Sequence, residues 1–492
     1  MGASIPVIIA VYFAVLLLIS RIASKKDGNN DAFFLGNKKS PWYVVATGML
    51  GDSVSGVTFV SVPGMVGQFD MTYMQMVLGF FPGYLIVAFV LLPLYYRLNL
   101  TSIYGYLEKR FGLRSYRTGA SFFILSRIVG SASKLYLVVL ILQALVFDQW
   151  HIPFYATVIV IVALIWAYTH RSGMKTIVWT DALQTLCLLA ALGLIIWQAA
   201  SKSGFDIPQV ADAVHSSKHS RIFVFDDWAS KQNFFKQFIG GIFIVIVMTG
   251  LDQNMMQKNL TCKTLKDAQK NMISYGFGFI PMNYLFLSLG ILLLVFAAKY
   301  GIVLPENPDQ ILPMLATEYL GTPALICFAI GIIAASFSNA DSALTSLTTS
   351  VCVDLLNVKK YEARQAWKIR NKVHLFVCFL FVSVIFLIGH INHSGILDTI
   401  YKAASYTYGP LLGLFFFGLF TRVNVKDKFV PLACITAPVV SYFLEYALLH
   451  VCNYRVGYEI LLFNGLITVL GLFFISGKSK AASFDGKRES NS

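Results

Sequence analysis

Long apolar runs separated by short polar loops recur along the whole chain. A membrane-spanning helix needs about 20 mainly apolar residues, and this rule gives about 13 spans here. We expect them near residues 4–22, 42–67, 70–97, 117–147, 152–170, 175–200, 234–258, 271–300, 321–355, 366–391, 395–420, 427–448 and 457–476. The pattern predicts an all-α polytopic membrane protein with a single transmembrane domain over residues 1–492.

Lysine and arginine are concentrated in alternate loops. The loops after the first, third, fifth, seventh, ninth and eleventh predicted spans are basic, and so is the tail at 477–492. The short loops GQFD, FDQWHI and GHINHSG between them contain neither Lys nor Arg. Because basic loops stay on the cytoplasmic side, we expect an outside N-terminus and a cytoplasmic tail. We place the chain in the cell membrane, as a bacterial inner-membrane protein.

Composition agrees with this assignment. The chain is 57% hydrophobic and only 13% charged, whereas a soluble domain carries roughly a quarter charged residues. The net charge of +14 follows from the basic cytoplasmic loops, so it does not indicate a nucleic-acid partner. The lipid bilayer is the partner that this composition requires.

Glycine-containing polar breaks interrupt two spans that lie five apart. The second span contains GMLGDSVSG and the seventh contains TGLDQ. Broken helices at corresponding places in two halves are typical of transporter binding sites. The two spans enter from opposite sides, which fits inverted five-helix repeats over 42–200 and 234–420. Membrane helices are rich in glycine in any case, so the breaks alone leave that simpler explanation open.

The ninth span contains a highly polar stretch, AASFSNADSALTSLTTS, at 334–350. At helical spacing, one face of this stretch carries the side chains of Ser338, Asp341, Ser342, Thr345 and Thr349. Small hard cations prefer oxygen ligands, and a carboxylate supplies the balancing charge. The stripe therefore predicts an alkali-cation site, with a proton relay through Asp341 as the alternative.

Charged residues within spans are rare and usually functional. Besides Asp341, this chain has Asp52, Asp181 and Arg127 inside predicted spans. Arg127 either pairs with an acid or faces an anionic ligand. Asp52 is a coordinating acid, a proton site, or the partner of Arg127 or Lys134.

Two further acids, Asp252 and Asp354, lie nearer the cytoplasmic ends of their spans, where solvent contact is a fair expectation. Ser55 and Thr58 follow the break in the second span. Unwound backbone at such a break frees carbonyl oxygens for an ion and leaves side chains for a substrate.

Five stretches, in order and at the expected loops or spans, resemble the sodium:solute symporter family. They are YGYLEKRFG (104–112), GMKTIVWTDALQ (173–184), GLDQNMMQKNLTCK (250–263), ASFSNADSALTS (335–346) and YGPLLGLFFFGLF (408–420). The resemblance covers nearly the whole chain. It implies a LeuT-type core and sodium-coupled transport of a solute such as a sugar, sialic acid, proline, pantothenate, iodide or a monocarboxylate.

The resemblance also implies sodium ligands. The family's shared sodium position corresponds to Gly51, Val54, Ala335, Ser338 and Asn339. The family commonly has two serines where this chain has Ser338 and Asn339. A second sodium position found in similar sialic acid and sugar members corresponds to Asp181, Ser338, Asp341 and Ser342.

Solute contacts in similar members come from the second span and the one after it. They correspond to Ser55, Thr58, Tyr73 and Gln75. The SITF stretch of sialic acid members resembles SGVTF (55–59), and their carboxylate-binding arginine falls near Arg127.

The sequence therefore predicts a sodium-coupled symporter that imports a small polar organic solute, such as a sugar or sialic acid, by alternating access. The alternatives are a sodium symporter for an amino acid or monocarboxylate, and a proton-coupled carrier. A membrane sensor with this fold ranks lower, because no kinase, nucleotide or DNA-binding motif follows the last span. An enzyme ranks lowest, because no nucleophile, base and orienting group share a site.

Overall fold

The structure is a computed structural model that describes residues 4–24, 30–170, 173–391, 396–452, 454 and 456–477. Within these ranges the chain is helical, and its β-pairing is limited to two isolated bridges, Ser40 with Cys262 and Val425 with Ser476. The prediction of an all-α fold is confirmed. The predicted cytoplasmic tail lies, after residue 477, outside the described residues.

Each predicted span coincides with a helix or with helices that continue one another. The uninterrupted spans are α1 (Ser4–Ser24), α9 (Phe154–Thr169), α10 (Met174–Ser203), α14 (Leu265–Tyr300), α17 (Ala363–Ile391), α18 (Ile396–Phe420), α19 (Val430–Cys452) and α20 (Ile460–Phe474). Three of the spans without a sharp bend include a π-helical turn: α5 (Tyr73–Ile86) with η2 (Val87–Leu91) and α6 (Leu92–Arg97), α8 (Leu113–Leu142) with η3 (Gln143–Phe147), and α16 (Thr322–Ser350) with η8 (Val351–Leu355).

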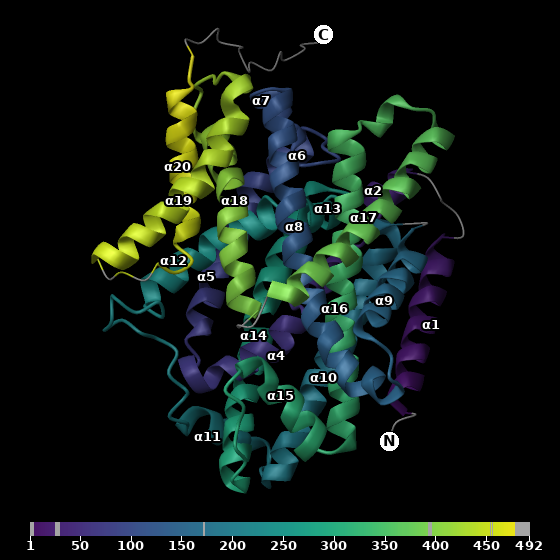
Figure 1. Cartoon of the computed structure of the whole chain (residues 1–492), viewed down its shortest axis with the longest axis vertical. Helices are drawn as coiled ribbons and strands as arrows, with labels where there is room; N and C mark the ends of the chain where they lie inside the picture. Colours follow the sequence, from purple (N-terminus) through teal and green to yellow (C-terminus); the bar gives the residue numbers. More distant parts are fainter. Residues whose placement is uncertain are drawn as a thin grey trace.

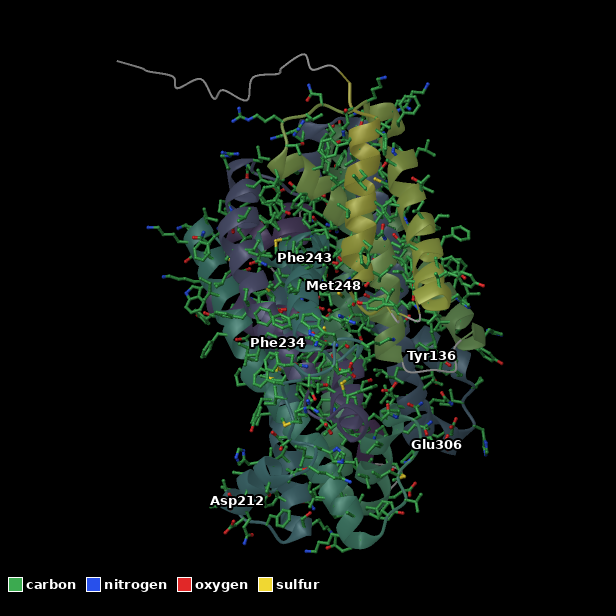
Figure 2. All side chains as sticks on the ribbon, turned by 90° about the vertical axis from the view of Figure 1, so that its left-hand side faces the viewer. Tyr136, Asp212, Phe234, Phe243, Met248 and Glu306 are labelled. Atoms are coloured by element: carbon green, nitrogen blue, oxygen red, sulfur yellow. The ribbon has the colours of Figure 1, made fainter. Side chains whose placement is uncertain are left out.

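Short helices occupy the loops. They are α2 (Asn30–Leu35), η1 (Gly36–Lys38), α7 (Gly105–Arg110), η4 (Asp148–Trp150), α11 (Ile207–Ser216), η6 (Pro308–Gln310), α15 (Ile311–Met314), η7 (Leu315–Tyr319), η9 (Val358–Lys360) and η10 (Asp427–Phe429). In Figure 1 the start of α1 and α11 lie toward one end of the molecule, and the end of α20 and α7 lie toward the other. Figure 2 shows Asp212 and Glu306 on opposite sides of the lower part of the molecule.

By length and composition, 8 helices of the described ranges are able to cross a membrane, or 10 if each of two bent pairs counts as one span. Three shorter apolar segments, Ala10–Ile19, Phe154–Thr169 and Ile460–Phe474, lie in the remaining predicted spans. The chain therefore has many apolar spans, and the count of about 13 stays a prediction.

The two bent pairs are the breaks that the glycine motifs predicted. The second span is split into α3 (Trp42–Ser53) and α4 (Gly56–Phe69), bent by 59°. The seventh is split into α12 (Phe234–Val245) with η5 (Ile246–Gly250), and α13 (Gln253–Asn259), bent by 69°.

Both breaks have the same local cause. An extended residue, Ser55 or Asp252, interrupts the helical dihedral angles, and its side-chain oxygen caps the next helix. Ser55 accepts from the N–H of Thr58 at 3.5 Å, and Asp252 accepts from the N–H of Met255 at 3.0 Å. Such caps satisfy backbone donors that would be costly to leave unpaired in a membrane. The breaks are therefore built into the sequence.

Small residues bring α5 and α12 into backbone contact. A Cβ on Gly79 would lie 2.1 Å from the carbonyl oxygen of Phe238, and one on Gly241 would lie 2.4 Å from that of Met76. In membranes, where lipid is as apolar as the helices, such close packing drives association. This contact holds α12, the first half of the broken seventh span, against the third span.

Gly79→Ala is therefore expected to lower the thermal unfolding temperature of the purified protein. The new Cβ would press on backbone, which has little room to move, and overpacking of this kind costs about 1–3 kcal/mol. Gly193→Ala in α10 is the matched control, because a Cβ there meets nothing within 4 Å. Equal losses in the two variants would contradict the close approach of α5 and α12.

Candidate ion and solute site

The polar stretch of the ninth span lies in the centre of the molecule. Every residue from Gly331 to Ser350 on α16 is buried. Three residues of the predicted stripe bond to other helices, whereas two serines off the stripe bond only within α16. Off the stripe, Ser336 and Ser346 donate to carbonyl oxygens of their own helix. On the stripe, Ser338, Ser342 and Asp341 bond to other helices.

Asp181 on α10 accepts hydrogen bonds from two hydroxyl groups of the stripe. Ser338 Oγ donates to its Oδ1 at 2.8 Å, and Ser342 Oγ donates to its Oδ2 at 3.2 Å. Asp341 lies beside them on α16, where its Oδ2 accepts from the Tyr168 hydroxyl at 2.8 Å. The structure thus gathers Asp181, Ser338 and Ser342 into one cluster of oxygens and gives Asp341 a partner on a third helix.

A lysine that the sequence analysis did not single out completes this cluster. The ammonium group of Lys258 lies 2.5 Å from Asp181 Oδ2 and 3.0 Å from Asp52 Oδ2. Lys258 is 1% exposed, and both carboxylates are equally buried. By its position in the sequence, Lys258 belongs to the basic loop after the seventh predicted span. The signal that could have found it is its place at the end of predicted span 234–258, which makes it an intramembrane cation.

The break in the second span faces the start of the stripe. The last helical bond of α3 runs from Val54 N–H to the carbonyl of Leu50 at 3.0 Å, so the carbonyls that follow, including those of Gly51 and Val54, have no partner within α3. Directly after the break, Gly56 packs against α16, where a Cβ would lie 2.5 Å from Ser336 Oγ.

Asn339 connects α16 to this break. Its amide nitrogen donates to the backbone oxygen of Asp52 at 3.0 Å and to Asp52 Oδ1 at 3.2 Å. Its amide oxygen is buried and accepts no hydrogen bond from any residue that the structure describes. The same holds for Asp341 Oδ1 and Thr345 Oγ1. Buried oxygens without a donor are costly, and a cation satisfies them.

Arg127 on α8 faces two acids at the breaks. Its Nη2 lies 3.7 Å from Asp52 Oδ1, and its Nη1 lies 3.9 Å from Asp252 Oδ2. At these distances the contacts are ion pairs but not hydrogen bonds. The Nε and Nη2 groups of Arg127 donate to no described residue. Arg127 and Lys134 line a small cavity of about 30 Å³ with Tyr408.

The expectation of solvated acids near the cytoplasmic ends is wrong. Asp252 is fully buried at the break of the seventh span and accepts from the Tyr408 hydroxyl at 2.5 Å. Asp354 is 3% exposed and accepts from Ser102 at 2.9 Å and from Tyr116 at 2.8 Å. Span seven bends inside the protein at Asp252, and span nine continues as η8 through Asp354. Nearness to a loop in the sequence therefore does not bring either acid to the surface.

The predicted solute contacts fall into two groups. Ser55 and Thr58 are buried together at the break. Tyr73 and Gln75 lie beyond α4, whose 14 residues separate them from the break by roughly 20 Å. The Gln75 amide is engaged with the loop before α12, because it donates to Gln232 O at 2.8 Å and accepts from Val224 N–H at 3.0 Å.

Tyr73 instead lines a large cavity of about 1140 Å³ at the α11 end of the molecule. Its walls come from α4, α5, the loop before α12, the start of α12, η6, α18 and the residues directly before α20. They carry five acids, Asp70, Asp226, Asp227, Asp309 and Glu459, and four basic residues, Arg221, Lys231, Lys236 and Lys402. The cavity extends along α4 to Ser61, which donates to Asp309 at 2.5 Å.

The sequence profile of the sodium:solute symporter family matches residues 33–430. The chain belongs to this family. The curated relatives that it resembles are sodium-coupled transporters, which agrees with the prediction of a transporter rather than an enzyme.

Individual relatives differ in their solutes. The human sodium/iodide cotransporter is 25% identical over 431 residues, which are 83% of this chain and 65% of that protein. The chain therefore spans slightly less than two thirds of the human protein. The sodium/sialic acid symporter SiaT of Proteus mirabilis is 25% identical over 426 residues, 84% of this chain and 83% of SiaT.

A solved structure confirms the fold. The substrate-bound outward-open state of a Na⁺-coupled sialic acid symporter superposes with a TM-score of 0.81, at 20% identity, over 96% of this chain and 99% of that one. The LeuT-type fold expected of this family is therefore present.

Proposed function

We propose that this chain is a sodium-coupled symporter that imports a small polar organic solute by alternating access. The observation that carries the proposal is the junction between the broken second span and α16. Backbone carbonyls outside the α3 ladder face a buried stripe of oxygens, and Asn339 Oδ1 there accepts no hydrogen bond from the described residues. Oxygen-only donor sets suit alkali cations rather than transition metals.

The sodium position consists of the carbonyls of Gly51 and Val54 with Ala335, Ser338 and Asn339. Because this position joins α3 to α16, a bound ion holds the two helices together. Transport then requires that the ion bind one conformation more tightly than the other. We assign the difference in ion affinity between the two conformations to the break in span two, where the chain bends by 59° between α3 and α4.

The solute passes between the outer cavity and the two breaks. The cavity volume of about 1140 Å³ is ample for a sugar-sized ligand. Ser55, Thr58 and Arg127 are the proposed solute contacts, with Tyr73 at the outer wall and Gln75 holding the outer loop in place. The likeness to the sialic acid symporter SiaT supports a sugar or sialic acid as the solute class.

The proposed orientation places the N-terminus outside and the C-terminus in the cytoplasm. It is supported by the basic loops, which obey the positive-inside rule, and by the two ends in Figure 1, which carry the start of α1 with α11 and the end of α20 with α7. The two broken spans begin the two proposed inverted repeats, 42–200 and 234–420.

Sodium coupling is tested by driving uptake into proteoliposomes with a sodium gradient and, separately, with a proton gradient of equal size. We expect accumulation only with sodium, because the proposed sodium position consists of carbonyl, hydroxyl and amide oxygens, none of which binds a proton at neutral pH. The solute is first selected by a thermal-shift screen of sugars, sialic acid, amino acids and monocarboxylates in sodium. Accumulation driven by protons alone would identify a proton-coupled carrier, with Asp341 as its proton site. An amino acid or monocarboxylate in the screen would correct the solute class and leave sodium coupling intact.

A further inference from the structure

The oxygen cluster around Asp181 already holds a positive charge of the protein's own. Lys258 Nζ contacts Asp181 Oδ2 at 2.5 Å and Asp52 Oδ2 at 3.0 Å. Ser342 donates to the same Asp181 oxygen at 3.2 Å, and Ser338 donates to the other at 2.8 Å. Both carboxylate oxygens of Asp181 therefore have donors without any added ion.

Lys258 is held in this place by a rigid support. Its neighbour Gln257 donates to Thr349 Oγ1 at 2.9 Å and to Phe34 O at 2.7 Å. On its other side, Asn259 accepts from Asn271 at 2.7 Å. These bonds connect α13 to α16, α2 and α14, and they hold the helix that carries Lys258 next to the cluster.

We propose that the Lys258 ammonium group is a tethered cation that takes the place of a second sodium ion at Asp181. The inference rests on the proposed function, because it assumes that a sodium ion binds at the junction of α3 and α16. An ammonium group and a sodium ion both select oxygen ligands, and with the ammonium group 2.5 Å from Asp181 Oδ2 a second positive charge on this buried carboxylate would be repelled. The wild-type protein therefore binds one sodium ion.

The consequence concerns how strongly the solute is concentrated. A free ion enters and leaves with each cycle and adds its gradient to the driving force. A tethered ammonium group balances the buried carboxylates but carries no gradient. Lys258 thus neutralises the carboxylates as a second sodium ion would. Only one sodium ion is then transported with each solute molecule.

Removing the ammonium group should open the second position. In Lys258→Met, the oxygens of Asp52, Asp181, Ser338 and Ser342 remain. Asp341 Oδ1, which accepts no hydrogen bond within the described residues, lies on the same stripe. The set is then composed of oxygens only, with an excess of negative charge, and we expect it to bind a sodium ion.

The test measures equilibrium binding of radioactive sodium to purified protein, which needs no knowledge of the solute. We expect one ion per wild-type chain and two per Lys258→Met chain. Lys258→Arg keeps the cation and should bind one, and the double variant Lys258→Met with Asp181→Asn should also return to one. Lys263→Met is the matched control, because Lys263 lies in the same basic stretch but is exposed.

Each other outcome has a distinct meaning. Two ions in the wild type, or one in Lys258→Met, would overturn the inference and leave sodium coupling in place. No sodium bound by the wild type would overturn the proposed function and the inference with it. Sodium should replace the lost charge, so Lys258→Met should be purified in high sodium and unfold at a lower temperature when sodium is exchanged for choline. A variant that cannot be purified even in high sodium would also overturn the inference.

Discussion

Asn339→Ala is expected to raise the sodium concentration for half-maximal binding roughly 10- to 100-fold. The amide oxygen of Asn339 is a buried acceptor at the proposed sodium position, and contacts of this kind to a charged group contribute about 1.5–3 kcal/mol. The substitution also removes the bonds from the Asn339 amide to Asp52 O and Oδ1, which align the broken span with α16.

The measurement is a sodium titration of radioactive-sodium binding to the purified variant. Ser346→Ala is the matched control, because Ser346 is buried on the same helix but donates only to its own backbone at Ala343. Asn339→Ser, which gives the pair of serines common in the family, should retain more sodium affinity than Asn339→Ala. An unchanged titration in Asn339→Ala would remove Asn339 from the sodium position.

Much of the architecture could be predicted because its causes are local. The spans follow from runs of apolar residues long enough to cross a bilayer, and the breaks follow from glycine-containing polar motifs at Gly51 and Gly250. The stripe on α16 could also be predicted, since helical spacing places Ser338, Asp341 and Ser342 on one face. The structure gives those side chains partners on other helices.

The electrostatic partners could not be predicted because they depend on where a bent helix returns. The 69° bend after η5 turns α13 across the protein interior. Lys258, which a hydropathy profile assigns to a basic loop, consequently lies between Asp52 and Asp181. The same bend buries Asp252. Charge counts along the sequence cannot separate a lysine facing cytoplasm from one folded back among carboxylates.

These partners also change what is expected of Arg127. Asp52, one of its two acids, is also paired with Lys258 at 3.0 Å and accepts from Asn254 at 2.6 Å. Asp252, the other, accepts from Tyr408 and from the N–H of Met255. Neither acid loses its last partner when Arg127 is removed, so the fold should survive. The guanidinium Nε and Nη2, which have no hydrogen bonds to described residues, remain available for a solute.

Arg127→Ala should therefore express and purify normally but lose about 30-fold or more in affinity for an acidic solute. Truncating one partner of a desolvated charge pair costs roughly 2–5 kcal/mol. Arg127→Lys should lose much of the affinity as well, because an ammonium group cannot reproduce the bidentate fork that a guanidinium offers to a carboxylate.

The measurement compares the binding of sialic acid with that of a neutral sugar to each variant in saturating sodium. Lys134→Met is the control for charge alone, because Lys134 lines the same small cavity as Arg127. Poor expression of Arg127→Ala that is restored by adding Asp52→Asn would show instead that Arg127 serves the ion pair. Unchanged sialic acid binding in Arg127→Ala, with normal expression, would exclude both roles. The carboxylate of an acidic solute would then need another partner, and the reason for preferring an anionic solute would be lost.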